Sequence, residues 1–301
     1  MDLEWGLNMR LDSTVRYPYQ MTLGAIQGND ALIEKMGFQI AQQCKRMGVH
    51  INYAPVVDVN NNPNNPVINF RSFGENRDAV TNKSLAYMRG LQKGGIITSA
   101  KHFPGHGDVS VDSHHDLPVI NKSRTELDSL ELYPFRELIN AGIGSVMVAH
   151  LSVPAIDKTP NLPTTLSVNN VTHLLREQLG FQGLTFTDAL EMQGVAKFFP
   201  KGEASARALI AGNDMLCLPG DVPGSIAAIK KAIKKRQLNW KDLNLRVKKV
   251  LLAKYQYGLA NWSPVSIENL TEDLNKGISA LRRRVAEDAI TLLRNENSAI
   301  F

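Results

Sequence analysis

The feature that most constrains the fold is a pattern repeated five times along the chain: a helix-like stretch, a glycine, a short apolar run and then polar residues. Glycine suits the end of a helix because the backbone there often turns left-handed. The apolar runs are continuous rather than alternating, which is typical of strands buried on both faces of a parallel sheet. The five segments are MGVHINYAPVVDV (47–59), KGGIITSAKHF (93–103), AGIGSVMVAHL (141–151), LGFQGLTFTDALEM (179–192) and AGNDMLCLPG (211–220). Their helix-ending glycines are Gly48, Gly94, Gly142, Gly180 and Gly212.

Apolar residues at helical spacing predict helices between these strands, at 29–47, 78–93, 124–141 and 201–211. Repeated βα units build either a doubly wound sheet or a closed barrel. No Gly-x-Gly-x-x-Gly follows any predicted strand, which disfavours a dinucleotide-binding fold. Barrels build their active sites from several strand ends, so polar residues after the strands favour an α/β fold of the (β/α)8 TIM-barrel type. Those residues are Asp58, Lys101 with His102, His150 and Asp188.

Only five strands can be recognised, whereas a barrel of this type has eight. After the fifth strand the chain shows helical patterns at 224–235, 240–257 and 267–293, with no further βα unit. We therefore expect the first two strands and most of the third to precede Met1, so that the barrel is incomplete at its N-terminus.

Composition excludes several other classes of protein. The net charge of +5 is modest for 301 residues, and the short basic runs at 234–236 and 282–284 are typical of solvated helix faces rather than a nucleic-acid site. No stretch reaches the 18 or so apolar residues of a membrane span. Cys44 and Cys217 are far apart in sequence, which disfavours a zinc knuckle or a redox pair.

The richest chemistry lies in KHFPGHGDVSVDSHHDLP (101–118), for which three interpretations are open: a metal site, an acid/base device and a solvated loop. Four imidazoles could bind a metal, but the Pro and Gly residues at 104–107 are incompatible with a helical His-x-x-x-His spacing. In an extended segment, side chains two apart fall on the same side. Asp112 could therefore orient His114, whose ordinary pKa suits proton transfer near neutral pH. The four imidazoles belong to His102, His106, His114 and His115.

Three other residues have both a structural and a functional interpretation. Asp188 could cap a following helix or serve as a nucleophile or base at a barrel mouth. Asp58 has the same placement after a strand and precedes a long loop rich in Asn and Pro. Arg71 could bind a carboxylate or sugar hydroxyls, or form an ordinary loop salt bridge.

Several motifs in order resemble the β-N-acetylglucosaminidases of glycoside hydrolase family 3, from Asp2 to about Asn295. The signature is Lys-His-Phe-Pro-Gly-His-Gly-Asp at 101–108, followed by Asp-Ser-His and Leu-Pro. The supporting motifs are Ala-Pro-Val-Val-Asp at 54–58, Arg-Ser-Phe-Gly at 71–74, Met-Val-Ala-His at 147–150, Thr-Leu-Ser at 165–167 and Phe-Thr-Asp at 186–188.

The resemblance implies a retaining exo-β-N-acetylhexosaminidase that releases terminal β-linked GlcNAc without a cofactor or metal. Asp188 would be the nucleophile, and Asp112 with His114 the acid/base pair. A phosphorylase acting on the same glycosides and a non-catalytic sugar-binding barrel are the alternatives. The residues implied to bind the sugar are Asp2, Asp58, Arg71, Lys101, His102, His150 and Met192. His106 and His115 receive no role.

The segment Asp2-Leu3-Glu4-Trp5-Gly6-Leu7 departs from the Asp-x-Glu-Gly-Gly-Arg usual in this family and resembles longer bacterial envelope proteins. We therefore expect a partial catalytic barrel at 1–262, and at 263–301 a helical extension that leads to a second domain outside this chain. The expected partner is a GlcNAc-containing oligosaccharide or muropeptide of the bacterial cell wall, and a periplasmic location is favoured over a cytoplasmic one.

Overall fold

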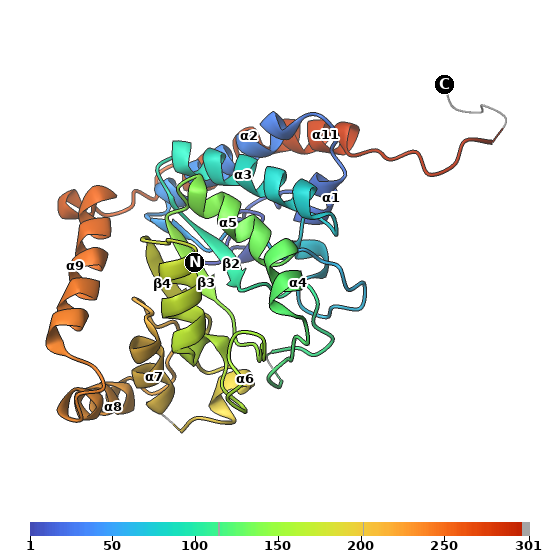
Figure 1. Ribbon diagram of the computed structural model, residues 1–301. Helices are drawn as coiled ribbons and strands as arrows, with labels where there is room; N and C mark the ends of the chain where they lie inside the picture. Colours follow the sequence, from blue (N-terminus) through green and yellow to red (C-terminus); the bar gives the residue numbers. More distant parts are fainter. Residues whose placement is uncertain (114, 201, 297–301) are drawn as a thin grey trace.

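The computed structural model describes residues 1–113, 115–200 and 202–296, and this part contains one parallel sheet (Figure 1). Its strand order is β1-β2-β3-β4, with Ser99 of β2 opposite Ser145 of β3, which in turn lies opposite Leu184 of β4. All residues of β2, β3 and β4 are buried, so the predicted buried parallel strands are confirmed. The strands are β1 (Ile51–Asn52), β2 (Ile97–Phe103), β3 (Ser145–Val148) and β4 (Leu184–Thr187).

Helices connect the strands and follow the last of them. They are α1 (Gln20–Gly24), α2 (Asp30–Arg46), α3 (Arg77–Lys93), α4 (Arg124–Ser129), α5 (Leu132–Asn140), α6 (Gln193–Ala196), α7 (Glu203–Ala211), α8 (Val222–Lys234), α9 (Trp240–Gln256), α10 (Leu270–Asn275) and α11 (Ile278–Asp288). Most lie close to the predicted ranges, but α1 and α6 were not predicted, and α11 ends at Asp288 rather than at 293. A π-helix, η4 (Asn169–Gln178), precedes β4, and 3-10 turns lie at η1 (Leu7–Met9), η2 (Asn69–Arg71), η3 (Thr164–Leu166) and η5 (Leu259–Asn261).

Two predicted helices are each divided in two. The stretch 124–141 forms α4 and α5, because Pro134 lacks an amide hydrogen and is accommodated in the first turn of a new helix. The stretch 267–293 forms α10 and α11, separated by Gly277 at a left-handed φ of 76°.

The fifth predicted strand is reduced to one bridge between Met215 and Phe186. The main-chain amide of Met215 donates a hydrogen bond to the carbonyl of Thr185, and its carbonyl accepts one from the amide of Thr187. The extended backbone then stops, because Leu218 takes a left-handed φ of 41° and Pro219 follows. A second correction concerns Gly94, whose φ of −77° is helical. Its neighbour Gly95 takes the left-handed conformation instead, at 77°.

The largest core lies around α2 and α3, which run side by side (Figure 1). Their close approach requires glycine on both helices. A Cβ on Gly37 would lie 2.5 Å from the carbonyl oxygen of Tyr87, and one on Gly90 would lie 2.0 Å from that of Glu34. Residues of α10 and α11, including Ile278 and Leu281, join this same core.

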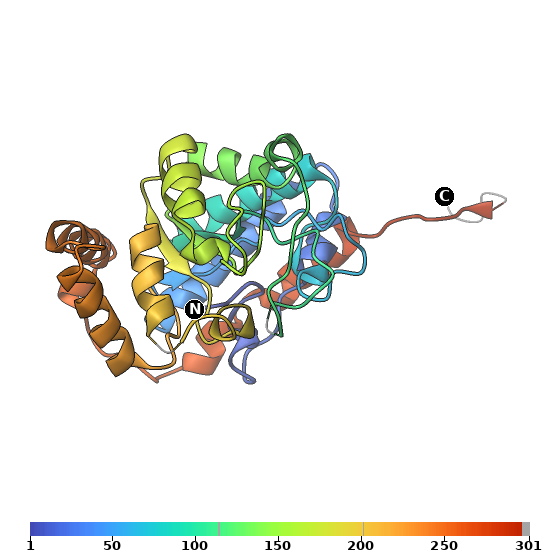
Figure 2. The ribbon, with the colours of Figure 1, turned by 60° about the horizontal axis from the view of Figure 1, so that its bottom comes forward.

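The chain therefore folds back after α9 to cover its first half. Figure 2 shows α8 and α9 on one side of the molecule and α11 on the other. Within residues 1–113, 115–200 and 202–296, no helix combines the length and the apolar character needed to cross a bilayer.

Candidate active site

The carboxyl ends of the parallel strands bring the predicted polar residues to one edge of the sheet. Lys101 and His102 lie near the carboxyl end of β2. His150 follows β3 by two residues, and Asp188 follows β4 directly. The backbone pairing of β3 and β4 extends to this edge, since the amide of Asp188 donates to the carbonyl of Val148 at 2.9 Å.

Asp58 is almost fully buried and orients His102. Its carboxylate lies 2.7 Å from Nδ1 of His102 and accepts the amide hydrogens of His102 at 3.1 Å and His106 at 2.7 Å. Arg71 Nη2, which can only donate, lies 3.3 Å from the other ring nitrogen of His102. We therefore assign the ring hydrogen to Nδ1, which donates to Asp58. Burial raises the pKa of Asp58, but the neighbouring His102 outweighs it, so the pKa lies below its ordinary value.

A buried carboxylate that the sequence prediction missed, Glu4, holds two cationic side chains. Lys101 Nζ lies 2.7 Å from Glu4, and Arg71 donates to Glu4 through Nη2 at 2.7 Å and Nε at 3.1 Å. Burial raises the pKa of Glu4, but Lys101 and Arg71 more than offset this and lower it to about 2. Glu4 could have been found from its position two residues after Asp2, which was predicted to bind the sugar. Asp2 itself lies 2.8 Å from Lys101 Nζ.

Asp188 does not cap a helix, because α6 begins at Gln193 with Met192 at its N-cap position. The helix-cap interpretation is therefore wrong. The carboxylate accepts the amide hydrogen of Ala189 at 2.8 Å. Burial raises the pKa of Asp188, but the nearby His150 and His102 outweigh burial and keep the carboxyl below its ordinary pKa, hence ionised at neutral pH.

His150 lies beside this carboxylate in a fixed orientation. Its Nδ1 is 2.7 Å from the hydroxyl of Thr165 and its Nε2 is 2.9 Å from the carbonyl oxygen of Ala189. Met192, four residues after Asp188 in the sequence, is buried and places an apolar side chain at the start of α6.

Of the predicted acid/base pair, Asp112 is described and His114 lies outside the described residues. Asp112 is half-buried, and its carbonyl accepts the amide hydrogens of His115 at 2.9 Å and Asp116 at 3.1 Å. Ser113 is buried, and its carbonyl accepts the amide hydrogen of Gly194 at 3.2 Å. The segment that carries Asp112 therefore docks on α6, which follows Asp188 in the chain.

Within the described ranges, which omit residue 114, no group of three or more His, Cys, Asp or Glu side chains could hold a metal ion. Both ring nitrogens of His102 lie within hydrogen-bond distance of protein side chains, with Nδ1 next to Asp58 and Nε2 next to Arg71. The metal interpretation of residues 101–118 therefore finds no support among the described residues.

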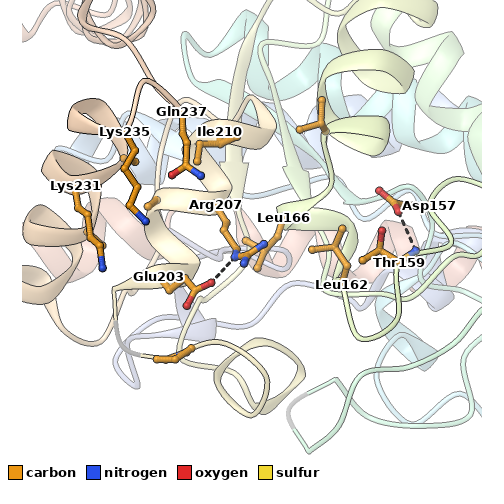
Figure 3. A pocket seen from close by; sticks show the side chains of 15 residues that line it. Asp157, Thr159, Leu162, Leu166, Glu203, Arg207, Ile210, Lys231, Lys235 and Gln237 are labelled. Atoms are coloured by element: carbon orange, nitrogen blue, oxygen red, sulfur yellow. Dashed lines mark hydrogen bonds and ion pairs between the residues drawn. The ribbon is translucent and has the colours of Figure 1, made fainter.

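A cavity of about 950 Å³ lies away from this cluster, between α7, α8 and the segment around η3 (Figure 3). Arg207 pairs with Glu203 at 2.7 Å on its wall, and Lys231 of α8 and Lys235, which directly follows α8, stand at its rim. None of the candidate site residues that the structure describes lines it, so the polar cluster at the sheet edge and this cavity are separate features.

Comparison with known proteins gives one consistent result. A sequence profile described as "Glycosyl hydrolase family 3 N terminal domain" matches residues 1–253. "Beta-hexosaminidase A" of Pseudoalteromonas piscicida is 33% identical over 319 residues, which cover 98% of this chain and 53% of that protein. The solved glycoside hydrolase family 3 β-N-acetylglucosaminidase from Paenibacillus sp. str. FPU-7 has a TM-score of 0.86 and 34% identity, and the match covers 98% of this chain and 56% of that one.

A second solved structure, "Beta-glucoside phosphorylase BglX", has a TM-score of 0.87 and 26% identity, and the match covers 95% of this chain and 54% of that one. The chain thus spans about half the length of these relatives. The predicted α/β fold of TIM-barrel type is confirmed by these matches and by the parallel sheet.

Proposed function

This chain belongs to glycosyl hydrolase family 3, and we propose that it carries the catalytic site of a retaining exo-β-N-acetylhexosaminidase that removes terminal β-linked GlcNAc. The observation that carries the proposal is the placement of Asp188. An ionised carboxylate follows β4 directly at the edge where Lys101, His102 and His150 also lie, and this is the arrangement that a glycosidase nucleophile needs.

The first step of the proposed reaction is attack by Asp188 on the anomeric carbon. The bond from that carbon to the leaving oxygen breaks as the carboxylate–carbon bond forms, which gives a covalent glycosyl-enzyme. His114, protonated and paired with Asp112, gives its proton to the leaving oxygen. A histidine replaces the second carboxylic acid of most retaining enzymes and suits this task because its ordinary pKa is near neutrality.

The second step releases the sugar with the configuration it had at the start. Neutral His114 removes a proton from water, and the oxygen attacks the anomeric carbon and displaces Asp188. Asp188 returns to its ionised form, which its lowered pKa favours. The enzyme is then ready for a second cycle, with His114 protonated again.

Sugar binding is proposed for the donors and acceptors beside the nucleophile. Lys101 and Arg71 are fixed by Glu4 and present N–H groups to sugar hydroxyls or to the acetamido oxygen. Asp2 keeps about a third of its side chain exposed and could accept hydrogen bonds from hydroxyls at the far edge of the ring. Asp58, His102, His150 and Met192 complete the set.

We further propose a GlcNAc-containing oligosaccharide or muropeptide as the substrate and the cell envelope as the compartment. The bacterial relatives named β-hexosaminidase and the resemblance of residues 2–7 to envelope proteins support this. Residues 1–262 would form the catalytic barrel, in line with the family match over 1–253, and 263–301 an extension that includes α10 and α11.

Phosphorolysis is the second candidate, favoured by the likeness to a β-glucoside phosphorylase. A histidine acid/base, unlike a carboxylate, would not repel an incoming phosphate. Turnover of 4-nitrophenyl β-GlcNAc with and without inorganic phosphate separates the two. Formation of GlcNAc 1-phosphate, with a rate that rises with phosphate, would replace hydrolysis as the assigned reaction.

The experiment for the proposed function compares the protein with its Asp188→Asn variant on 4-nitrophenyl β-GlcNAc. We expect loss of at least 10³-fold in kcat/KM, because a carboxamide is not a nucleophile of comparable strength. Asp128→Asn, on the exposed surface of α4, is the matched control and should retain full activity. Binding of GlcNAc without turnover by the unaltered protein would favour the non-catalytic alternative.

A further inference from the structure

His106 and Ser113 form a buried contact that the proposed reaction does not use. The side chain of His106 is 2% exposed and Ser113 is 3% exposed. Nε2 of His106 lies 3.2 Å from the hydroxyl oxygen of Ser113, and Nδ1 of His106 has no partner among the described residues. A ring buried with one nitrogen unsatisfied is costly, so the hydrogen bond that its other nitrogen makes requires an explanation.

The position of His106 is fixed by the same carboxylate that orients His102. Asp58 accepts the amide hydrogen of His106 at 2.7 Å. The turn before and after His106 is equally constrained, because Gly105 takes a left-handed φ of 128° and a Cβ on Gly107 would lie 1.7 Å from the carbonyl oxygen of Val59. His106 therefore presents its ring to Ser113 from a rigid support.

Ser113 is held from the opposite side by α6. Its carbonyl accepts the amide hydrogen of Gly194, and a Cβ on Gly194 would lie 3.1 Å from that same oxygen and 3.5 Å from Cβ of His150. Gly194 therefore lies next to both Ser113 and His150, and His150 contacts the carbonyl of Ala189, the residue after Asp188.

We propose that His106 is a positioning residue that, through its hydrogen bond to the Ser113 hydroxyl, holds Ser113 on α6. The proposal rests on the proposed function, in which Asp112 before Ser113 and His114 after it transfer the proton. His106 acts through Ser113 and does not itself touch the substrate.

The protonation state of His106 fits this role. Burial and the neighbouring His102 lower its pKa to about 4, so the ring is neutral near pH 7. A buried unpaired N–H group is rarer than an unpaired acceptor. We therefore assign the single ring hydrogen to Nε2, which donates to the Ser113 hydroxyl and leaves Nδ1 as the unsatisfied acceptor. A neutral buried ring is also unsuited to catalytic proton transfer, which separates His106 from His114.

The kinetic test uses two substrates that differ in their need for acid catalysis. For Ser113→Ala and for His106→Leu, kcat/KM on phenyl β-GlcNAc should fall about tenfold, the effect of losing one buried hydrogen bond. On 4-nitrophenyl β-GlcNAc, whose leaving group needs little protonation, the fall should be within about twofold. His106→Gln, which retains an N–H donor, should recover most of the loss. His115→Gln, an exposed imidazole in the same segment, should behave as the unaltered protein.

Coupling and exchange measurements complete the test. The double variant His106→Leu/Ser113→Ala should be no worse than either single variant, because both remove the same bond. Equal losses on both substrates, or fully additive losses, would overturn the proposal. Amide hydrogen exchange of peptides within 108–117 should be faster in His106→Leu and in Ser113→Ala. Unchanged exchange in both variants would also contradict the proposed positioning role of His106.

The exchange measurement does not depend on activity. If the unaltered protein cleaves no GlcNAc glycoside, the proposed function fails, while the exchange result still decides whether His106 anchors Ser113. Should His106→Leu not fold, Ser113→Ala removes the same bond by deleting one hydroxyl and carries the test alone.

Discussion

The Glu4 carboxylate, fully buried, lies 2.7 Å from the Lys101 ammonium. The same carboxylate binds Arg71, so one buried anion fixes two cationic donors that face the proposed sugar site. If either donor turned away, the fully buried Glu4 carboxylate would keep only one cationic partner. The geometry of the sugar site therefore depends on a residue that need not touch the sugar.

We predict that Glu4→Gln destabilises the protein by about 3 kcal/mol or more, because Arg71 loses its carboxylate partner and the buried Lys101 keeps only Asp2. The measurement is the free energy of unfolding in urea. Glu203→Gln, which removes an exposed pair with Arg207 one helical turn away, should cost under about 1 kcal/mol. Equal effects of the two substitutions would show that the Glu4 network contributes no more than a surface ion pair.

Two buried groups should make stability depend on pH in different windows. The pKa of His106 is lowered from 6.5 to about 4, so between these values the unfolded chain binds a proton that the folded chain rejects, and stability falls as pH drops. Glu4, lowered from 4.5 to about 2, stabilises the fold above pH 4.5 and loses this contribution as pH falls toward 2. Each shift corresponds to about 3 kcal/mol.

His106→Gln should therefore flatten the fall in unfolding free energy between pH 6.5 and 4 and leave the fall below pH 4 in place. Glu4→Gln should do the reverse. His115→Gln serves as the control and should keep both parts of the profile. If the unfolding free energy of His106→Gln depends on pH between 6.5 and 4 as that of the unaltered protein does, His106 is not the group responsible for the fall in that range.

For His114, we predict a loss that depends on the leaving group. His114→Ala should lower kcat/KM on phenyl β-GlcNAc by 10² to 10⁴-fold, the usual range for general acid catalysis. The loss on 4-nitrophenyl β-GlcNAc should be much smaller, because nitrophenolate departs without a proton. The measurement is kcat/KM for both substrates, and equal losses would mean that His114 is not the acid.

Much of the fold could be predicted because continuous apolar runs and helix-ending glycines are local signals. The four strands and the helices α2 to α5 and α7 to α9 lie close to their predicted ranges, whereas α6 was not predicted. The fifth strand could not be predicted correctly, since its apolar run looks like the others. What ended it was the left-handed backbone of Leu218, a property of the folded chain.

The candidate site shows the same limit. Asp58, Lys101, His102, His150 and Asp188 were predictable from their places after strands, and the structure brings them to one edge. Glu4 was missed because it lies outside the five repeated segments and gains its meaning only from contacts with Lys101 and Arg71. The pairing of His106 with Ser113 was equally hidden, because six residues, one of them a glycine, separate them along the chain.

The most direct measurement of the central claim is the site of covalent attachment of a trapped sugar. The protein is incubated with 5-fluoro-GlcNAc carrying an activated β-linked leaving group, digested and analysed by mass spectrometry. We expect one added glycosyl mass on the peptide that contains Asp188, and none in Asp188→Asn. An adduct on another residue, or turnover that releases the α-anomer first, would contradict Asp188 as the nucleophile of a retaining enzyme.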